Sequence, residues 1–397
     1  MEDVVEETPK LDAKIELVDQ NDKNKTVTTF SSLADFTESS LQILDHKTPF
    51  FKSRSRRRRT DTWIISIFVI FHLIAFIATM IVNDCSTNSH GDCAIKSLGR
   101  MSFQPLSENP FLGPSASTFD KMGAIRKTLL IEHRTWHLFS CPWLHAGLIH
   151  LIINLICVIF LGIYLEQEFG PLRVGIIYTV SAFFGTLVTA LFVRDSPVVS
   201  SSGAQFGLLG ATLSALIRNW KLYTNKTAAV LILLVVFVCN FLLGLLPFVD
   251  NFSNIGGLIS GFLLGFVLLF TPQLRQAAQK KSGLYEYGLK SVLTWKQKLD
   301  RPILRSVSLL LFTLLFFGFL AAALQGINIS KYCKRCGYFD CIPSKSWSCN
   351  DVTTSCETMS SDTELTLTCM ENGNFKVLTF RNISQARIRD LCTLICS

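Results

Sequence analysis

The chain has 397 residues, of which 49% are hydrophobic, and it carries a formal net charge of +8. This composition excludes an ordinary soluble domain, and several apolar runs reach about 20 residues, the length that a helix needs to cross a bilayer. The basic residues cluster beside these runs instead of covering a surface. The charge therefore indicates membrane orientation, and a nucleic-acid or lipid-headgroup partner is the less favoured interpretation.

The first 60 residues are rich in Asp, Glu, Lys, Ser and Thr and show no amphipathic periodicity. Such a segment buries too little apolar surface to fold alone, so residues 1–60 are expected to form a disordered cytoplasmic tail. Its start does not have the basic-then-apolar pattern of a signal peptide, and the first membrane helix is expected to direct insertion. Lys52, Arg54 and the run from Arg56 to Arg59 stand directly before that helix and favour its cytoplasmic side.

The hydrophobic runs predict seven membrane spans, at about residues 63–83, 143–165, 172–193, 203–219, 227–247, 253–271 and 304–325. The first six form a core over residues 61–271, with a long first loop at 84–142. A basic cytoplasmic loop at 272–303 precedes the seventh helix, and a Cys-rich tail occupies 326–397. Seven crossings from a cytoplasmic N-terminus would leave this tail on the luminal or extracellular side.

The cysteines test this topology. Two lie in the first loop, Cys85 and Cys93, and eight lie in the tail: Cys333, Cys336, Cys341, Cys349, Cys356, Cys369, Cys392 and Cys396. Both segments would face an oxidising compartment, and the even counts favour disulfide pairing. The spacing of Cys333 and Cys336 also fits zinc, but a zinc site would require a reducing compartment and the opposite topology. Asn328 and Asn382 begin glycosylation sequons, and Asn382 is favoured because Asn328 is close to the membrane.

Polar residues stand at the starts of the fourth and sixth spans. Ser202 opens the fourth span, and Asn254 occupies the same, non-cytoplasmic end of the sixth. Serines before a helix are most simply N-caps, but a serine facing a polar residue at membrane depth is a functional-site candidate. Small residues would let the two helices approach closely, namely Gly203, Gly207, Gly257 and Gly261.

The second span carries His150 and Asn154, which are separated by four residues and so share one helical face. They could join neighbouring helices through hydrogen bonds. With a serine nearby, they could instead donate hydrogen bonds to a developing oxyanion.

Together these residues resemble the rhomboid family of intramembrane serine proteases. That family has a Gly-x-Ser-Gly nucleophile motif opening its fourth helix, a catalytic His on its sixth and a His-x-x-x-Asn pair on its second. The segments 144–147 and Glu166-x-x-x-Gly170 are similar to the entry and exit of its second helix, and residues 102–106, 121–123 and the Cys-rich tail resemble plant members. The resemblance covers about residues 60–350 and implies an all-α membrane protein. It would have a rhomboid-like six-helix core, a seventh C-terminal transmembrane helix and a disulfide-rich tail, with no cofactor and no metal.

Three positions depart from the family pattern. Asn254 stands where the catalytic His is expected, Ser200 replaces the first Gly of the nucleophile motif, and His137 replaces the Arg that follows Trp136. By resemblance, Ser202 is the retained nucleophile and Asn254 marks the lost base. An amide does not titrate near neutral pH, and loss of the base in a soluble serine protease costs about 10⁶ in turnover. The Gly-to-Ser change at 200 predicts local strain or crowding.

No histidine follows the second span; the seven are His46, His72, His90, His133, His137, His145 and His150. The resemblance assigns His150 to the oxyanion side, so a rewired Ser202–His150 dyad is the less favoured route to activity. We therefore expect an inactive rhomboid homologue that binds transmembrane client proteins in the lipid bilayer of the secretory pathway, in the Golgi, ER or plasma membrane. The alternatives are an active intramembrane serine endopeptidase with a non-standard base, and a receptor or scaffold acting through its luminal tail.

Overall fold

The structure, a computed structural model, describes residues 49–51, 62–88, 93–106, 108–126, 135–192, 196–220, 223–269, 302–333, 336–339, 341–342, 356–361, 364–370, 372–379 and 385–396. Most of the expected N-terminal tail, nearly all of the basic loop and the Asn382 sequon lie outside these residues, so the expectations for them stay predictions.

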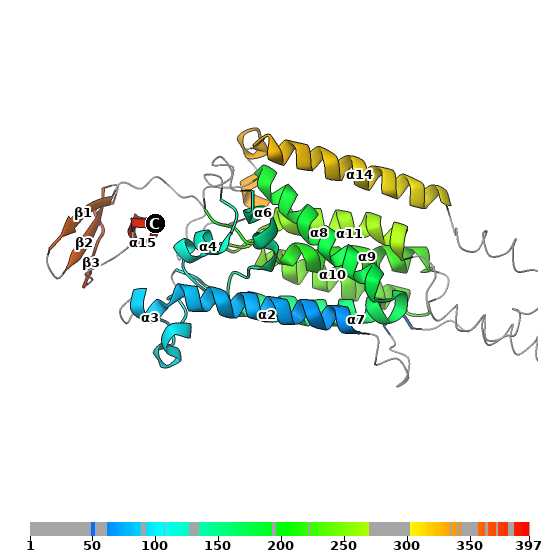
Figure 1. The fold of residues 1–397 in the computed structure, drawn as a ribbon, viewed down its shortest axis with the longest axis horizontal. Helices are drawn as coiled ribbons and strands as arrows, with labels where there is room; N and C mark the ends of the chain where they lie inside the picture. The colour runs from blue at the N-terminus through cyan, green and yellow to red at the C-terminus, as the bar shows by residue number, and fades with distance from the viewer. Residues whose placement is uncertain are drawn as a thin grey trace, which may run out of the picture.

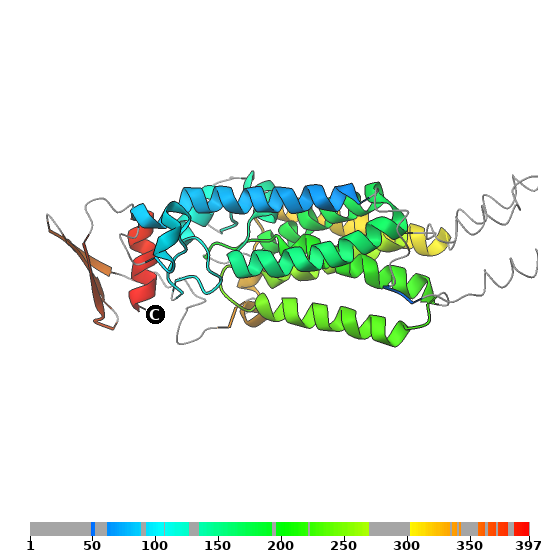
Figure 2. The same cartoon turned by 90° about the horizontal axis from the view of Figure 1, so that it is seen from below.

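Seven long helices run side by side (Figures 1 and 2), namely α2 (Trp63–Asn83), α7 (Leu148–Phe169), α8 (Pro171–Phe192), α9 (Ser202–Arg218), α10 (Lys226–Leu243), α11 (Asn251–Leu268) and α14 (Pro302–Leu324). Within the described part of the chain, six are long and apolar enough to cross a membrane. The exception is α9, which has 17 residues and is almost entirely buried. The predicted multi-pass helical class is confirmed, with the fourth predicted span as a short central helix.

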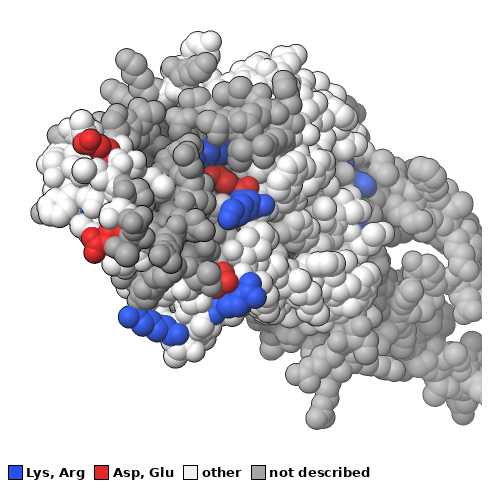
Figure 3. Space-filling view, turned by 60° about the vertical axis from the view of Figure 1, so that its left-hand side comes forward, with Lys and Arg blue, Asp and Glu red and all other residues white. Residues whose placement is uncertain are grey.

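Figure 3 shows the same division between lipid-compatible and polar surface. The flank of the bundle in this view is nearly free of charged side chains, while described acidic and basic residues gather toward the first loop and the tail. Many large apolar side chains remain exposed on α2, α10 and α14. In a bilayer these side chains face hydrocarbon.

The second predicted span begins five residues too early. A 3-10 turn, η2 (Cys141–Trp143), and an irregular segment precede the true helix start at Leu148. The carbonyl of Ala146 accepts a hydrogen bond from Asn109 Nδ2 at 2.8 Å, which ties this segment to the first loop. Apolar composition alone cannot separate such a buried loop from the helix that follows it.

Glu166 has a structural task at the opposite end of α7. Its two carboxylate oxygens accept hydrogen bonds from the backbone N–H groups of Ile64, at 2.9 Å, and Ile65, at 3.1 Å. These N–H groups belong to the first turn of α2, where no carbonyl within the helix can accept them. Glu166 therefore caps α2 from a neighbouring helix. Gly170 then ends α7 with a φ of 94°, a conformation that favours glycine.

The expected disordered tail includes a short packed segment. The Phe50 ring lies 4.6 Å from that of Tyr223 and 4.9 Å from that of Tyr164, and its backbone N–H donates to Asn225 Oδ1 at 2.7 Å. The adjacent Phe51 ring lies 5.0 Å from Phe160. Residues 49–51 therefore pack against the bundle, because this aromatic pair occupies an apolar site formed by distant parts of the chain.

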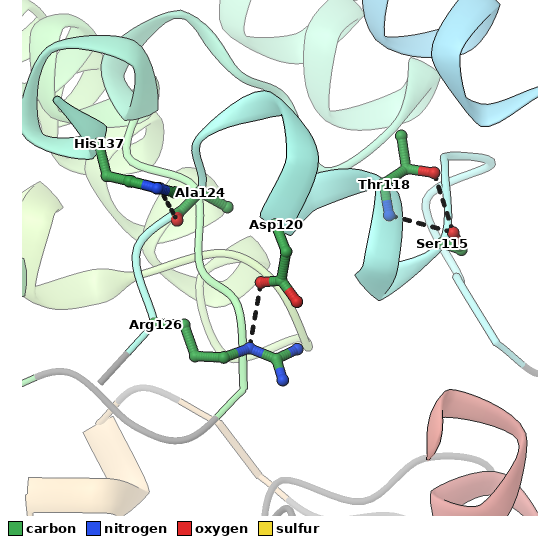
Figure 4. Close-up of polar contacts among 6 residues, drawn as sticks. All are labelled: Ser115, Thr118, Asp120, Ala124, Arg126 and His137. Atoms are coloured by element: carbon green, nitrogen blue, oxygen red, sulfur yellow. Dashed lines mark hydrogen bonds and ion pairs between the residues drawn. The ribbon is translucent and has the colours of Figure 1, made fainter. Parts of the chain in front are cut away.

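The first loop contains α3 (Cys85–Asn88), η1 (Lys96–Met101), α4 (Ala116–Met122) and α6 (His137–Ser140). Asn83 organises it, since Asn83 Oδ1 accepts from Gln104 Nε2, the Ser115 backbone N–H and Thr118 Oγ1. Figure 4 shows Ser115 capping α4 through the N–H of Thr118, and Asp120 paired with Arg126 at 3.1 Å.

His137, where the family pattern has Arg, also holds this loop. Its Nδ1 lies 2.8 Å from the carbonyl oxygen of Ala124 (Figure 4). Because a carbonyl only accepts, Nδ1 must carry the proton. At position 137 the His side chain therefore joins α6 to the loop through a hydrogen bond to a backbone carbonyl.

Beyond α14 come two short 3-10 turns, η4 (Ile329–Lys331) and η5 (Cys336–Phe339), and then a small sheet with a helix at one end of the molecule (Figure 1). The strands β1 (Cys356–Ser360), β2 (Leu365–Cys369) and β3 (Phe375–Leu378) pair antiparallel in that order, and α15 (Gln385–Cys396) covers Leu367 and its buried neighbours.

Disulfides join Cys85 to Cys93, Cys333 to Cys336, Cys356 to Cys392 and Cys369 to Cys396, and Cys341 is also disulfide-bonded. The disulfide-rich tail is confirmed. The zinc interpretation of the Cys333 and Cys336 pair is wrong, because their sulfurs are bonded to each other.

The glycines at the interface between α9 and α11 bring two backbones into contact. A Cβ at Gly257 would lie 2.0 Å from the Gly203 carbonyl oxygen, and one at Gly261 would lie 1.9 Å from that of Gly207. Neither separation is possible for a real side chain. This seam fixes the distance between the helices that carry Ser202 and Asn254.

Replacing Gly261 with Ala should therefore force the two helices apart and lower the free energy of unfolding by about 1–3 kcal/mol. Gly318→Ala in α14 is the matched control, since nothing lies within 4 Å of its added Cβ. Thermal unfolding of the purified protein in detergent would measure both. Equal stability of the two variants would contradict the close contact.

Candidate functional site

Three short contacts position the segment that leads into α9. Val198 pairs antiparallel with Ile125 of the first loop, Val199 pairs in parallel with Val249, and the Ser200 N–H lies 3.4 Å from the Cys141 carbonyl. The chain then enters the helix with Ser201 at the N-cap and Ser202 as its first residue. The loops before α9 and α11 are thereby held side by side at the same end of the bundle.

The expectation of strain at Ser200 is wrong. Its φ does not lie in the left-handed region, where a glycine would be needed. Its hydroxyl is 2.8 Å from Thr186 Oγ1 of α8, so the buried polar group has a partner. The serine is accommodated because the neighbouring helix provides a hydroxyl for it.

Cys141, which lies beside this loop, offers no replacement for a lost catalytic group. Burial raises the pKa of its thiol to about 12, and the thiol donates to the carbonyl of Val198 at 3.3 Å. At neutral pH it is therefore an unionised, inaccessible thiol.

The start of α11 is fixed by Asp250. Its carboxylate accepts from the backbone N–H groups of Phe252 at 2.9 Å and Ser253 at 3.0 Å, and Thr189 Oγ1 of α8 also donates to it. This is an N-cap in which the charge also faces the positive end of the helix dipole. The cap sets the rotation of α11 and so the position of Asn254 one turn further along.

Asn254 is fully buried and its amide is directed along its own helix. Its Nδ2 donates to Asn251 Oδ1 at 2.8 Å. Asn251 in turn donates from Nδ2 to the carbonyls of Phe241, at 3.0 Å, and Phe339, at 2.8 Å. Asn254 thus belongs to a chain of amides that links α11 to the end of α10 and to the segment after α14.

Ser202 is only 3% exposed, and its Oγ has no hydrogen-bond partner among the described residues. Asn254 Oδ1 also has no hydrogen-bond partner among the described residues. The structure therefore shows no described side chain in position to take the proton of Ser202. A serine hydroxyl without such a partner is a weak nucleophile.

His150 and Asn154 lie close to the serines but are occupied with other groups. His150 Nδ1 accepts from the Ala146 N–H at 3.2 Å, and its Nε2 is 3.0 Å from Asn154 Nδ2. Because Nδ1 accepts, the neutral ring carries its proton on Nε2, so the Asn154 oxygen must face the ring. A nitrogen that already carries a proton cannot act as the base for Ser202, which weighs against the rewired dyad.

Two further polar residues complete the surroundings. The Asn154 amide lies 3.5 Å from Ser201 Oγ, so the His150 and Asn154 pair of α7 is beside the start of α9. His145 stands edge-on to His72, and burial, assisted by the neighbouring His72 and His150, holds the pKa of His145 well below its usual range. His145 is therefore neutral. The site as a whole presents hydrogen-bonding groups without a charged acid or base next to Ser202.

Known proteins resemble this sequence. The Rhomboid domain pattern matches residues 132–270. The chain is 51% identical over 317 residues to Inactive RHOMBOID-like protein 8 of Arabidopsis thaliana, a match that spans 79% of this chain and 90% of that one. It belongs to the rhomboid family. It is also 41% identical over 337 residues to RHOMBOID-like protein 1 of the same plant, covering 84% of this chain and 85% of the relative.

This rhomboid protein contains site residues that sequence reasoning missed. Asp250, Asn251 and Thr189 position the start of α11, and the buried Gln205 lies one turn below Ser202. A signal existed for Gln205, since a side-chain amide within an otherwise apolar membrane helix is costly and hence informative. The N-cap bonds of Asp250 are local, but its contact with Thr189 and that of Asn251 with Phe339 join distant segments, and spacing could not indicate them.

Removing the cap of α11 should loosen the site. We expect Asp250→Ala to lower the free energy of unfolding by about 1–2 kcal/mol, because two backbone N–H groups lose their acceptor. Asp250→Asn keeps an acceptor oxygen and is expected to retain most of that stability. Thermal unfolding in detergent distinguishes the two variants, and an unaffected alanine variant would contradict the assigned role of the cap.

Proposed function

We propose that this chain is a catalytically inactive rhomboid protein that binds transmembrane client proteins in the secretory pathway. One observation carries the proposal: the Ser202 hydroxyl has no described base beside it, while Asn254, at the position of the family's catalytic His, directs its amide to Asn251. The hydroxyl proton has no acceptor of suitable basicity, so attack on a peptide carbonyl is not assisted. The name of the 51% identical relative supports the same conclusion.

The proposed client binding is supported by features of the rhomboid fold that this chain retains. The glycine seam, the cap of α11 and the His150 and Asn154 pair maintain an ordered polar site inside an apolar bundle. Next to it, α10 is weakly embedded, with only Ala229, Leu233 and Asn240 buried among its residues. An ordered site beside a helix with few buried side chains suits entry of a client helix from the bilayer, the route that active family members use for substrates.

The disulfides support the proposed orientation. Pairs occur in the first loop and after α14, and the two segments lie at the same end of the bundle (Figure 1). Disulfides persist in oxidising compartments. We infer that this end is luminal or extracellular, that the basic segments flanking the core are cytoplasmic, and that the protein resides in the Golgi, ER or plasma membrane.

Restoring the base tests the loss of catalysis. Asn254→His is expected to raise cleavage of a model transmembrane substrate by at least about a hundredfold over the native chain, since a positioned base contributes this much or more. Adding Ser200→Gly should change this little, because Ser200 is not strained. Cleavage is measured by gel in proteoliposomes.

The matched control combines Asn254→His with Ser202→Ala, which should abolish the gain. Labelling with a fluorophosphonate gives an independent measurement on the native chain. Robust labelling of native Ser202 that disappears in Ser202→Ala would show that a different base operates and would refute the proposed inactivity.

Protease protection tests the orientation. In sealed secretory vesicles with the cytoplasmic face outward, added protease should remove residues 1–60 and leave the tail at 326–397 intact. Detergent permeabilisation, as the control, should expose the tail. Digestion of the tail in intact vesicles would reverse the proposed topology.

A further inference from the structure

Gln205 is a buried side chain without a partner. It is the fourth residue of α9 and is 1% exposed, yet neither its Oε1 nor its Nε2 has a hydrogen-bond partner among the described residues. An unpaired buried amide is costly in any protein, and more so at membrane depth. The packing of the bundle does not use its hydrogen-bonding capacity.

The direction of Gln205 follows from its neighbours. Ser201, four residues earlier, shares its helical face and approaches Asn154 of α7 at 3.5 Å. Phe206, the next residue, packs on Phe237 of α10 with 5.7 Å between ring centroids. The glycines of α9 face α11 on another side. Gln205 therefore faces α7, next to the boundary with α10.

Two more polar side chains occur at the same depth. Cys157 lies three residues below Asn154 on α7 and is a free thiol. Asn240 of α10 is buried, and its Nδ2 lies 3.5 Å from Cys157 Sγ, a weak contact. Cys157, Gln205 and Asn240 thus form what we call the inner polar layer, about one helical turn below Ser202.

The layer is polar but uncharged. No Asp, Glu, Lys or Arg occurs within 148–165 of α7, 202–217 of α9 or 227–243 of α10. A charged group brought to this level would find no counter-ion, whereas an amide or hydroxyl would find both a donor and an acceptor on Gln205. The chemistry of the layer selects for neutral hydrogen-bonding side chains.

We propose that the inner polar layer is a recognition site for an uncharged polar side chain, Asn, Gln, Ser or Thr, located about one turn inside the luminal end of a client transmembrane helix. Gln205 is the specificity-determining residue. This inference rests on the proposed client binding and deepens it by naming the feature of the client that is read.

The test uses the full-length protein in nanodiscs and a synthetic apolar helix of about 21 Leu and Ala residues with Lys at both ends. One peptide carries a single Asn four residues from its luminal end, a second has Leu there, and a third carries the Asn at its centre. We expect the first to bind about threefold to tenfold more tightly than the other two. Fluorescence anisotropy measures the three affinities.

Two variants test whether Gln205 causes the preference for the first peptide. Gln205→Leu is expected to remove it, so that the three peptides bind equally, and to leave thermal stability unchanged or higher, since an unpaired buried amide is lost. Thr212→Val is the matched control on α9. Its hydroxyl bonds only to the Leu208 carbonyl of its own helix among the contacts of the described residues, and it should keep the preference.

The outcomes separate the two proposals. If no peptide binds the native protein, the proposed client binding fails and this inference with it. If all peptides bind equally, or if the preference survives in Gln205→Leu, only the inner polar layer is refuted. A marked loss of stability in Gln205→Leu with an unchanged preference would show that Gln205 holds a structural water, and would also refute the inference.

Discussion

The contact between the backbones of α9 and α11 is the constraint on which the rest of the site depends. Carbonyl oxygens of Gly203 and Gly207 lie where a side chain on Gly257 or Gly261 would have to be. In a bilayer, apolar side chains gain little by leaving lipid for protein, so close packing of this kind provides much of the association energy between helices. Because the seam reaches the ends of both helices that carry Ser202 and Asn254, it also fixes where these two residues stand.

Once α9 and α11 are in place, the side chain at position 254 decides whether the site has a base. An imidazole at 254 could accept a proton near neutral pH, but an amide cannot. The Asn254 amide instead donates a hydrogen bond to Asn251, which in turn donates to the carbonyls of Phe241 and Phe339. In active rhomboid proteases this position carries the catalytic base. Here Asn254 helps to connect α11 with α10 and with the segment after α14.

The sequence predicted the helices well and the contacts between them poorly. Six spans agree with the structure to within a few residues, because runs of apolar side chains are a strong local signal. The start of α7 was misplaced, since a buried loop is as apolar as a helix. The packing of Phe50 could not be predicted, because its partners, Tyr164 and Tyr223, are far away in sequence. The family pattern indicated which residues to place at the site. The tautomer of His150 and the hydroxyl partner of Ser200 could be read only from their neighbours in the structure.

The same distant contacts bear on how a client could enter. At its N-cap, α10 is joined to the N-terminal segment, since Asn225 accepts a hydrogen bond from the Phe50 N–H. At its other end, Phe241 is joined through Asn251 to Phe339, and the Leu245 carbonyl accepts from the Ile342 N–H. The helix with few buried side chains is therefore held at both ends by segments outside the six-helix core. Under the proposed function, a client helix inserted between α7 and α10 would have to offset these contacts, so its affinity would reflect the free energy of displacing α10 as well as the hydrogen bonds gained. Hydrogen bonds to Gln205 are a suitable source of that free energy, because they satisfy groups that the resting bundle leaves unpaired.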